Sequence, residues 1–360
     1  MYLKLYERYV VRETFSAILL VLAAFLALFS FFDLINELKS VGKGGYQFIH
    51  AAIFVLLSLP GRVYELIPIA ALIGALYSLS TLARNSEITV LRASGLSTRE
   101  LLTTLFKVAG VLAVATLVVG EGVMPFSEKA AQELRTRAMS NVIALQGFNS
   151  GLWVKDGRSF INIRTATPDA RLEGVRIYTF NEANALESVT DAKEGEFEPP
   201  DRWKLGGVVS MVLQGESARV DRQETKEWQS AVTPDLLSVL MVAPERMSLY
   251  GLFNYTRHLL ENKQKTERYE IAIWKKLIYP LTALVMVALA LPFGYSYSRV
   301  GGVSLKIFGG VMVGILFHML NGLFSSLGVI NSWPPFASAA APSILFLLAA
   351  MVMLWWVERR

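Results

Sequence analysis

The chemistry open to this sequence is limited by the types and spacing of its reactive residues. His50, His258 and His318 lie far apart along the 360-residue chain, which has no cysteine for a disulfide or a thiolate metal site. No glycine-rich phosphate loop, G-x-S-x-G nucleophile motif or H-E-x-x-H metal motif occurs. We therefore expect a protein that is not an enzyme, that holds no metal or cofactor of its own, and that acts through charged and apolar surfaces.

The first such surface is expected in "TLARNSEITVLRASGLSTRELL", residues 81–102. Gly95 suits the left-handed position after a helix end, and Ser97 with Glu100 forms a capping box for the next helix. A short helix is thus predicted from about residue 86 to 94, with Glu87 in the first turn, where the helix dipole favours a carboxylate. It is either a connector lying on the bilayer or a docking surface that receives force from a motor protein, made of Arg84, Ser86, Glu87, Ile88, Val90, Leu91, Ser94 and Gly95.

A second surface is expected at the end of the first apolar run. Three phenylalanines of this run share one helical face, and charged residues follow directly after them. The charges are either a solvated helix end with (i, i+4) pairing or a rim that meets an anionic head group. The aromatic face contacts bulk lipid, the protein core or a bound acyl chain. The residues are Phe25, Phe29, Phe32, Asp33, Lys39 and Lys43.

A third surface is expected in the apolar run from 307 to 330. Gly310, Gly314, His318 and Gly322 recur every four residues, a spacing that lets helices pack closely. A histidine inside a membrane span is also a candidate functional residue. The adjacent face is apolar and could line a cavity through Phe308, Met312, Ile315 and Met319.

The elements that must position these residues are membrane spans. The chain is 53% hydrophobic and only 18% charged, against about 25% charged in soluble domains. Long apolar runs that can cross a hydrocarbon core of about 30 Å are expected near residues 14–32, 63–83, 101–124, 277–298, 307–330 and 334–357. The first is expected to be retained, because no signal-peptide cleavage pattern is present. Residues 48–65, which Pro60 interrupts, are expected to lie at the interface.

The middle of the chain has the pattern of a soluble β domain. Short alternating stretches such as "SFINIRTA" and "KLGGVVSMVLQG" are separated by turn residues between about 148 and 243, which favours an antiparallel sandwich or barrel-like sheet. An amphipathic helix is then expected to lead back to the membrane. The predicted fold is an α-helical membrane protein with a 3+3 arrangement of spans and an inserted jellyroll-like β domain. The predicted domains are 1–124, 125–275 and 276–360.

Basic residues are distributed unevenly between the two sets of loops. Most lie at the junctions on the side of the termini, among them Arg84, Arg92, Arg99 and Lys306, whereas the opposite short loops hold mainly Lys39 and Lys43. The positive-inside rule then places both termini and residues 81–102 in the cytoplasm and the β domain outside. The net charge of +5 follows from these junctions, so no nucleic-acid partner is expected.

Several stretches together resemble one known family. They are "RYV", "LKSVGKGGY", "YELIPIAALIGAL", "SEITVLRASGLS", "GLWVKDG" and "KIFGGVMVGILFH", with "PP" before the last span. With the 3+3 layout they resemble, over essentially the whole chain, the LptF/LptG (YjgP/YjgQ) permeases of the lipopolysaccharide-export ABC transporter. Within the family the chain looks more similar to the LptG branch than to the LptF branch.

The resemblance implies partners and a location. It implies a bacterial inner-membrane permease that pairs with an LptF-like permease, an LptB-like ATPase dimer, an LptC-like single-span protein and a periplasmic LptA-like bridge. ATP and Mg²⁺ would bind to the ATPase. Lipopolysaccharide would enter from the outer leaflet of the inner membrane, between the first and fifth spans of both permeases.

The resemblance also implies roles for individual residues. Glu87 matches the acid of the family's coupling helix, and Lys39 matches a basic position that meets sugar phosphates. Asp33 departs from relatives that carry lysine there, so Lys43 or the second permease would supply that charge. Three alternatives stay open: the sister permease LptF, a permease of the lipoprotein-release or efflux type, and a ligand-binding membrane sensor.

Overall fold

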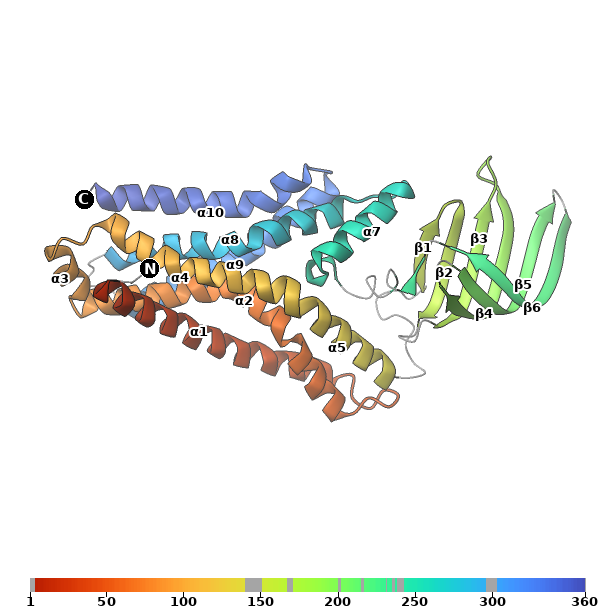
Figure 1. Ribbon diagram of the computed structural model, residues 1–360, viewed down its shortest axis with the longest axis horizontal. Coiled ribbons are helices and arrows are strands. Elements are labelled where there is room, and N and C mark those ends of the chain that lie inside the picture. The colour runs from red at the N-terminus through yellow and green to blue at the C-terminus, as the bar shows by residue number, and fades with distance from the viewer. Residues whose placement is uncertain are drawn as a thin grey trace.

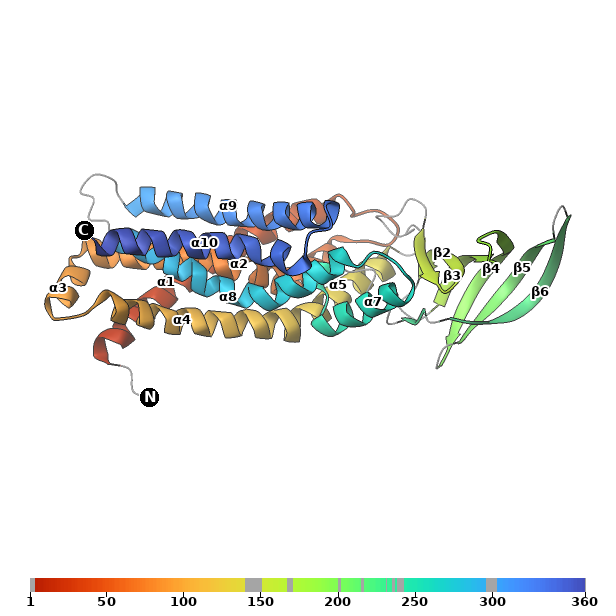
Figure 2. The ribbon, with the colours of Figure 1, turned by 90° about the horizontal axis from the view of Figure 1, so that it is seen from above.

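The computed structural model describes residues 4–139, 151–166, 171–199, 202–214, 217–230, 232–234, 237, 243–295 and 303–359. Its long helices form an elongated bundle, and its strands form a sheet beyond one end of that bundle (Figure 1). Both ends of the chain and the short helix α3 lie at the other end (Figures 1 and 2).

Six helical segments within the described ranges are long and apolar enough to cross a membrane. This number and the even split around the sheet confirm the 3+3 prediction. The helices of the first half are α1 (Leu5–Leu38), α2 (Phe48–Arg84), α3 (Glu87–Ala93), α4 (Thr98–Val118), η1 (Val119–Val123) and α5 (Met124–Ala138). Those that follow the sheet are η2 (Pro244–Arg246), α7 (Leu249–Glu261), α8 (Glu267–Tyr295), α9 (Val303–Ile330) and α10 (Pro335–Glu358).

Helix α2 corrects one prediction. Residues 48–65 are not a segment separate from the second span but the first part of a single helix of 37 residues that contains Pro60 and Pro68. A proline removes one backbone donor, yet membrane helices tolerate it where neighbouring helices pack against the site. Helix α2 has such neighbours: 78% of its most apolar window is buried, against 6% in α1.

The third span continues well past its predicted end. Helices α4, η1 and α5 form one helical segment, Thr98–Ala138, in which η1 is a π-helical turn. Gly120 lies in this turn, where an added Cβ would be 2.6 Å from the Tyr64 ring. The domain ranges 1–124, 125–275 and 276–360 stay a prediction.

The inserted β domain is confirmed. Its strands are β1 (Leu152–Asp156), β2 (Ser159–Ala166), β3 (Arg171–Phe180), β4 (Leu186–Glu198), β5 (Arg202–Gln214) and β6 (Ser217–Gln229). Each pairs antiparallel with the next, so the described strands form one sheet in sequence order. One face is apolar because alternate side chains point to it. Trp203 is fully buried there, and its indole N–H donates to the carbonyl of Val232 over 2.7 Å.

Candidate functional site

Helix α3 ends as its sequence predicts. Gly95 has a φ of +94°. Its N–H donates to the Arg92 carbonyl over 2.9 Å, and the N–H of Leu96 donates to the Leu91 carbonyl over 3.0 Å. These are the two bonds of a Schellman motif, in which glycine adopts the left-handed conformation at little cost.

The connections of α3 to its neighbours are equally well defined. Ser86 lies between α2 and α3 and has a left-handed φ of 63°. Its N–H donates to the Ala83 carbonyl of α2 over 3.0 Å. On the other side the N–H of Glu100 donates to Ser97 Oγ over 3.2 Å, while the Ser97 N–H donates to Glu100 Oε2 over 3.0 Å. The predicted capping box is therefore present, and α3 is a defined unit between two long helices.

The apolar residues of α3 divide between the bundle and the surface. Ile88 is 7% exposed and belongs to the bundle core, and Leu91 packs partly against that core. Val90 is 63% exposed. The bundle itself thus covers Ile88 and part of Leu91, whereas Val90 is left on the outer surface of α3. Arg84, Ser86 and Ser94 are exposed as well.

Glu87 is oriented by a neighbouring side chain. Asn85 Nδ2 donates to Glu87 Oε1 over 3.2 Å, and Tyr9 of α1 is close enough to interact electrostatically with the same carboxylate. The Glu87 side chain stays half-exposed. A carboxylate that is oriented but still accessible can accept hydrogen bonds from a basic group of another protein.

The predicted lipid-contacting residues lie on the two least covered spans. Only 6% of the most apolar window of α1 and 17% of that of α9 are buried. On α1, Phe25 is half-buried and its ring centroid is 6.3 Å from that of Phe29, and Phe32 is exposed. On α9 the whole predicted face is exposed, with Phe308, Met312, Ile315 and Met319.

Helix α2 lies between these two spans, because both pack against it. An added Cβ at Gly74 would be 2.5 Å from Ile18 of α1. An added Cβ at Gly310 would be 2.3 Å from Leu76 Cδ1, and one at Gly314 would be 3.1 Å from Ile69. Gly310 and Gly314 therefore serve helix packing, whereas an added Cβ at Gly322 would meet nothing within 4 Å. His318 is exposed on the neighbouring surface.

Lys39 and Lys43 are both exposed after the end of α1. Lys39 donates to Asn36 Oδ1 over 3.1 Å. The nearby Glu37 is buried and does not pair with either lysine: it accepts a hydrogen bond from Tyr46 at 2.9 Å and lies 3.4 Å from Arg135. Burial raises the pKa of Tyr46, so its hydroxyl remains a donor. Both ammonium groups are thus accessible.

Asp33 does not belong to that exposed rim. Its carboxylate accepts two hydrogen bonds from Arg62 of α2, at 2.7 and 2.8 Å. The Arg62 guanidinium also lies 5.9 Å from the centre of the Phe29 ring, within cation–π range. Asp33 is therefore paired by a cation that is distant in sequence.

The Asp33–Arg62 pair belongs to a larger ion network that the sequence predictions missed. Arg62 Nη1 donates to Glu65 over 2.9 Å, and Arg246 of η2 connects Glu65 (3.3 Å) with the buried Glu128 (3.0 Å). The sequence feature that could have revealed this network is the presence of charged residues, such as Arg62 and Glu65, inside an apolar run. Their partners Glu128 on α5 and Arg246 on η2 lie outside the apolar runs of the sequence, where a charged residue is not unusual.

These features define a class of protein: a membrane protein with several spans and an inserted β domain. Two of its spans are sparsely covered, and two exposed lysines follow the end of one of them. The sequence profile described as lipopolysaccharide export system permease LptF/LptG matches residues 8–356. The chain belongs to this family.

Individual relatives agree with this assignment. The chain is similar to the lipopolysaccharide export system permease protein LptG of Escherichia coli (strain K12), with 33% identity over 98% of both chains. It is also similar to the protein of the same name from Haemophilus influenzae, with 31% identity over 98% of both chains. Membership of this family argues against the lipoprotein-release permease and the sensor as alternatives.

Proposed function

We propose that this protein is a permease subunit of a lipopolysaccharide export system, and that ATP hydrolysis in a partner protein drives it. The observation that carries the proposal is the pair of sparsely covered spans, α1 and α9, on either side of the buried α2. Family membership supports it, because two relatives with nearly the same length carry that name.

The surface suits an amphipathic anion. The apolar side chains of Phe32, Met312 and Met319 are exposed and can contact acyl chains, while Lys39 and Lys43 can meet phosphates beyond the apolar region. Ordinary lipid also contacts exposed helices, but the combination of an aromatic face with two accessible cations at its end favours a phosphorylated glycolipid.

Energy would enter at α3. The chain has no phosphate-loop motif, so we infer an LptB-like ATPase dimer that binds ATP and Mg²⁺ and docks on α3 near Glu87 and Val90. An LptF-like permease would complete the lipid surface. An LptC-like protein and a periplasmic LptA-like bridge would receive the lipid from the β domain.

The orientation follows from the same proposal. The chain would lie in the bacterial inner membrane with both termini and α3 in the cytoplasm and the sheet in the periplasm. The opposite placement of α3 and the sheet along the bundle (Figure 1) supports this topology.

Photocrosslinking tests the proposed lipid surface. A benzoylphenylalanine at Met312 of α9 should crosslink lipopolysaccharide in cells. The same residue at Leu345 of α10, which is also exposed, is the matched control and should crosslink bulk phospholipid only. Equal lipopolysaccharide yields at both positions would contradict a dedicated surface on α1 and α9.

A further inference from the structure

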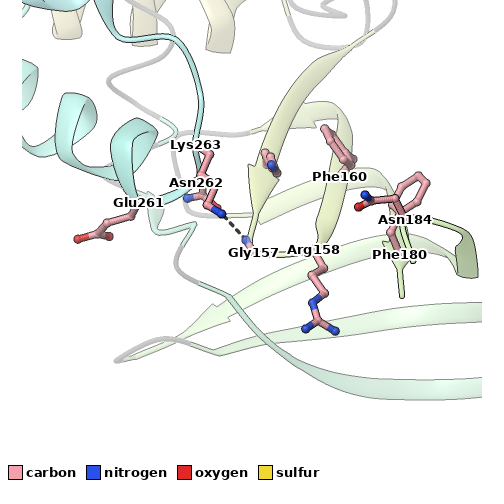
Figure 3. A pocket seen from close by; sticks show the side chains of 9 residues that line it. Gly157, Arg158, Phe160, Phe180, Asn184, Glu261, Asn262 and Lys263 are labelled. Carbon is pink, nitrogen blue, oxygen red and sulfur yellow. Dashed lines mark hydrogen bonds between the residues drawn. The ribbon is translucent and has the colours of Figure 1, made fainter. Parts of the chain in front are cut away.

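A cavity of about 450 Å³ lies where the first β-hairpin meets the end of α7. Figure 3 shows its side chains, which come from the hairpin, from β3 and the turn after it, and from the last residue of α7 and the two residues that follow it. The volume falls in the range of small-molecule sites. Neither the family assignment nor the lipid surface of α1 and α9 uses this cavity.

The cavity is built by a fixed contact between the hairpin and α7. The turn residue Gly157 has a φ of +57°, and its N–H donates to Asn262 Oδ1 over 2.7 Å. Asn262 is the buried C-cap of α7, and its Nδ2 also donates to the carbonyl of His258 over 3.0 Å. Because this amide binds both elements, the two walls of the cavity keep one relative position.

The end of α7 directs a cation to the cavity. Lys263 occupies the left-handed position of a Schellman motif, with a φ of 53°, where glycine is the usual residue. The N–H groups of Lys263 and Gln264 donate to the last carbonyls of the helix at 3.0 and 2.9 Å. Since those carbonyls are already hydrogen-bonded, they compete less for the lysine ammonium group.

The cavity carries a positive charge that nearby carboxylates do not cancel. Across the described ranges, no carboxylate lies within ion-pair distance of Lys155 or Lys263, whereas Arg158 pairs with Glu182 at 2.9 Å. The one acidic lining residue, Glu261, pairs with Arg257 at 3.0 Å. Two lysines therefore remain available for an anion.

The opposite wall is aromatic. The rings of Phe160 and Phe180 meet edge to face, with centroids 5.6 Å apart. Phe160 is 40% exposed, so its ring is accessible, and the Lys155 ammonium group lies 5.6 Å from its centre. The Asn184 side chain stands beside Phe180 and offers an amide (Figure 3). Ring faces contact the C–H faces of sugars, and amides bind hydroxyls.

We propose that this cavity binds a phosphorylated sugar, with the phosphate at Lys155 and Lys263 and the sugar ring against Phe160. The inference rests on the proposed function, because a phosphorylated saccharide that leaves the membrane end of the bundle would pass the junction with the β domain. It adds a saccharide contact outside the membrane to the acyl-chain contact on α1 and α9.

Photocrosslinking of the full-length chain in nanodiscs tests this proposal. The photoreactive residue replaces the exposed Ala183, next to Asn184 in the turn at the rim of the cavity. The nanodiscs contain either lipopolysaccharide or phosphatidylglycerol alone. We expect a crosslink to lipopolysaccharide that free glucosamine 6-phosphate reduces. Replacing both lysines (K155Q and K263Q) should lower the yield about tenfold, as the loss of two charge-assisted contacts predicts.

Two sets of variants control for charge and folding. The double variant K193Q and K204Q removes the same charge from β4 and β5, outside the cavity, and should crosslink normally. The variant K155R with K263R keeps both cations and should restore most of the yield if the double glutamine variant folds poorly.

Each failure has a distinct meaning. A crosslink from the Met312 position without one from the Ala183 position would overturn the cavity inference and leave the proposed function intact. Loss of both crosslinks would overturn both. Equal crosslinks to phosphatidylglycerol, or equal competition by inorganic phosphate, would show a general anion site and contradict a sugar ligand.

Discussion

At the scale of single residues, Asp33 shows how a long-range partner changes a functional role. In sequence it follows the aromatic run of α1 directly and looks like part of the charged rim. In the structure its two carboxylate oxygens each accept a hydrogen bond from Arg62, and its side chain is only 23% exposed. The accessible charges at this end of α1 are therefore Lys39 and Lys43. The sequence could not show this, because the pair joins residues 29 positions apart.

Breaking this pair should destabilise the bundle. Arg62→Gln leaves the Asp33 carboxylate half-buried without its cation and should lower the free energy of unfolding by about 2 kcal/mol. Adding Asp33→Asn removes the stranded charge and should recover at least half of that loss. Thermal unfolding in detergent measures both variants, and a double variant no more stable than Arg62→Gln would refute a direct pair.

Glu87 gives a second prediction at this scale. Glu87→Arg should reduce co-purification of the proposed ATPase partner about tenfold, since it replaces an acceptor with a repelling cation. Glu187→Arg makes the same charge reversal at an exposed site on β4. It is the matched control and should leave co-purification unchanged. Undiminished ATPase recovery with Glu87→Arg would reject α3 as the docking helix.

At the scale of elements, local signals predicted α3 and its surroundings well. Gly95 and the Ser97–Glu100 box act over a few residues, so their roles could be identified from spacing alone. The continuity of α2 through Pro60 was not predicted, because a proline weakens a helix signal unless the surrounding helices are known. The partners of Glu65 on other elements were missed for the same reason: nothing local specifies them.

The close approach of α1 to α2 gives a prediction for these elements. Gly74→Ala places a methyl group 2.5 Å from the Ile18 backbone and should cost about 2 kcal/mol through forced separation of the helices. Gly110→Ala, in α4, meets nothing within 4 Å and should stabilise the chain by up to about 1 kcal/mol through helix propensity. Unfolding temperatures of the two variants should therefore move in opposite directions.

At the scale of the whole molecule, composition and apolar runs were sufficient for the 3+3 layout and the inserted sheet. Six runs of spanning length and one alternating region are properties of long segments, which tolerate local errors. The pairing order of the strands and the central position of α2 are properties of tertiary packing. The sequences of α1 and α2 are both apolar, yet α1 is largely exposed and α2 is buried at the centre of the bundle.

The orientation can be tested directly because the chain contains no cysteine. A single cysteine at Thr225 of β6 should react with a membrane-impermeant maleimide in spheroplasts. One at Thr89 of α3 should react only after the membrane is permeabilised. Both positions are exposed, so accessibility within the fold is matched. Labelling of Thr89→Cys in intact spheroplasts would reverse the proposed topology.

The uninterrupted helical segment Thr98–Ala138 has a mechanical consequence. Its 41 residues correspond to about 60 Å at the α-helical rise, roughly twice the thickness of a hydrocarbon core. It begins beside α3 and ends at the approach to the sheet (Figure 1). As a stiff lever, it would convert a tilt of about 10° at one end into a displacement of about 10 Å at the other. A small rotation at the α3 end would therefore move the end of α5, at the approach to the sheet, by about the width of a helix.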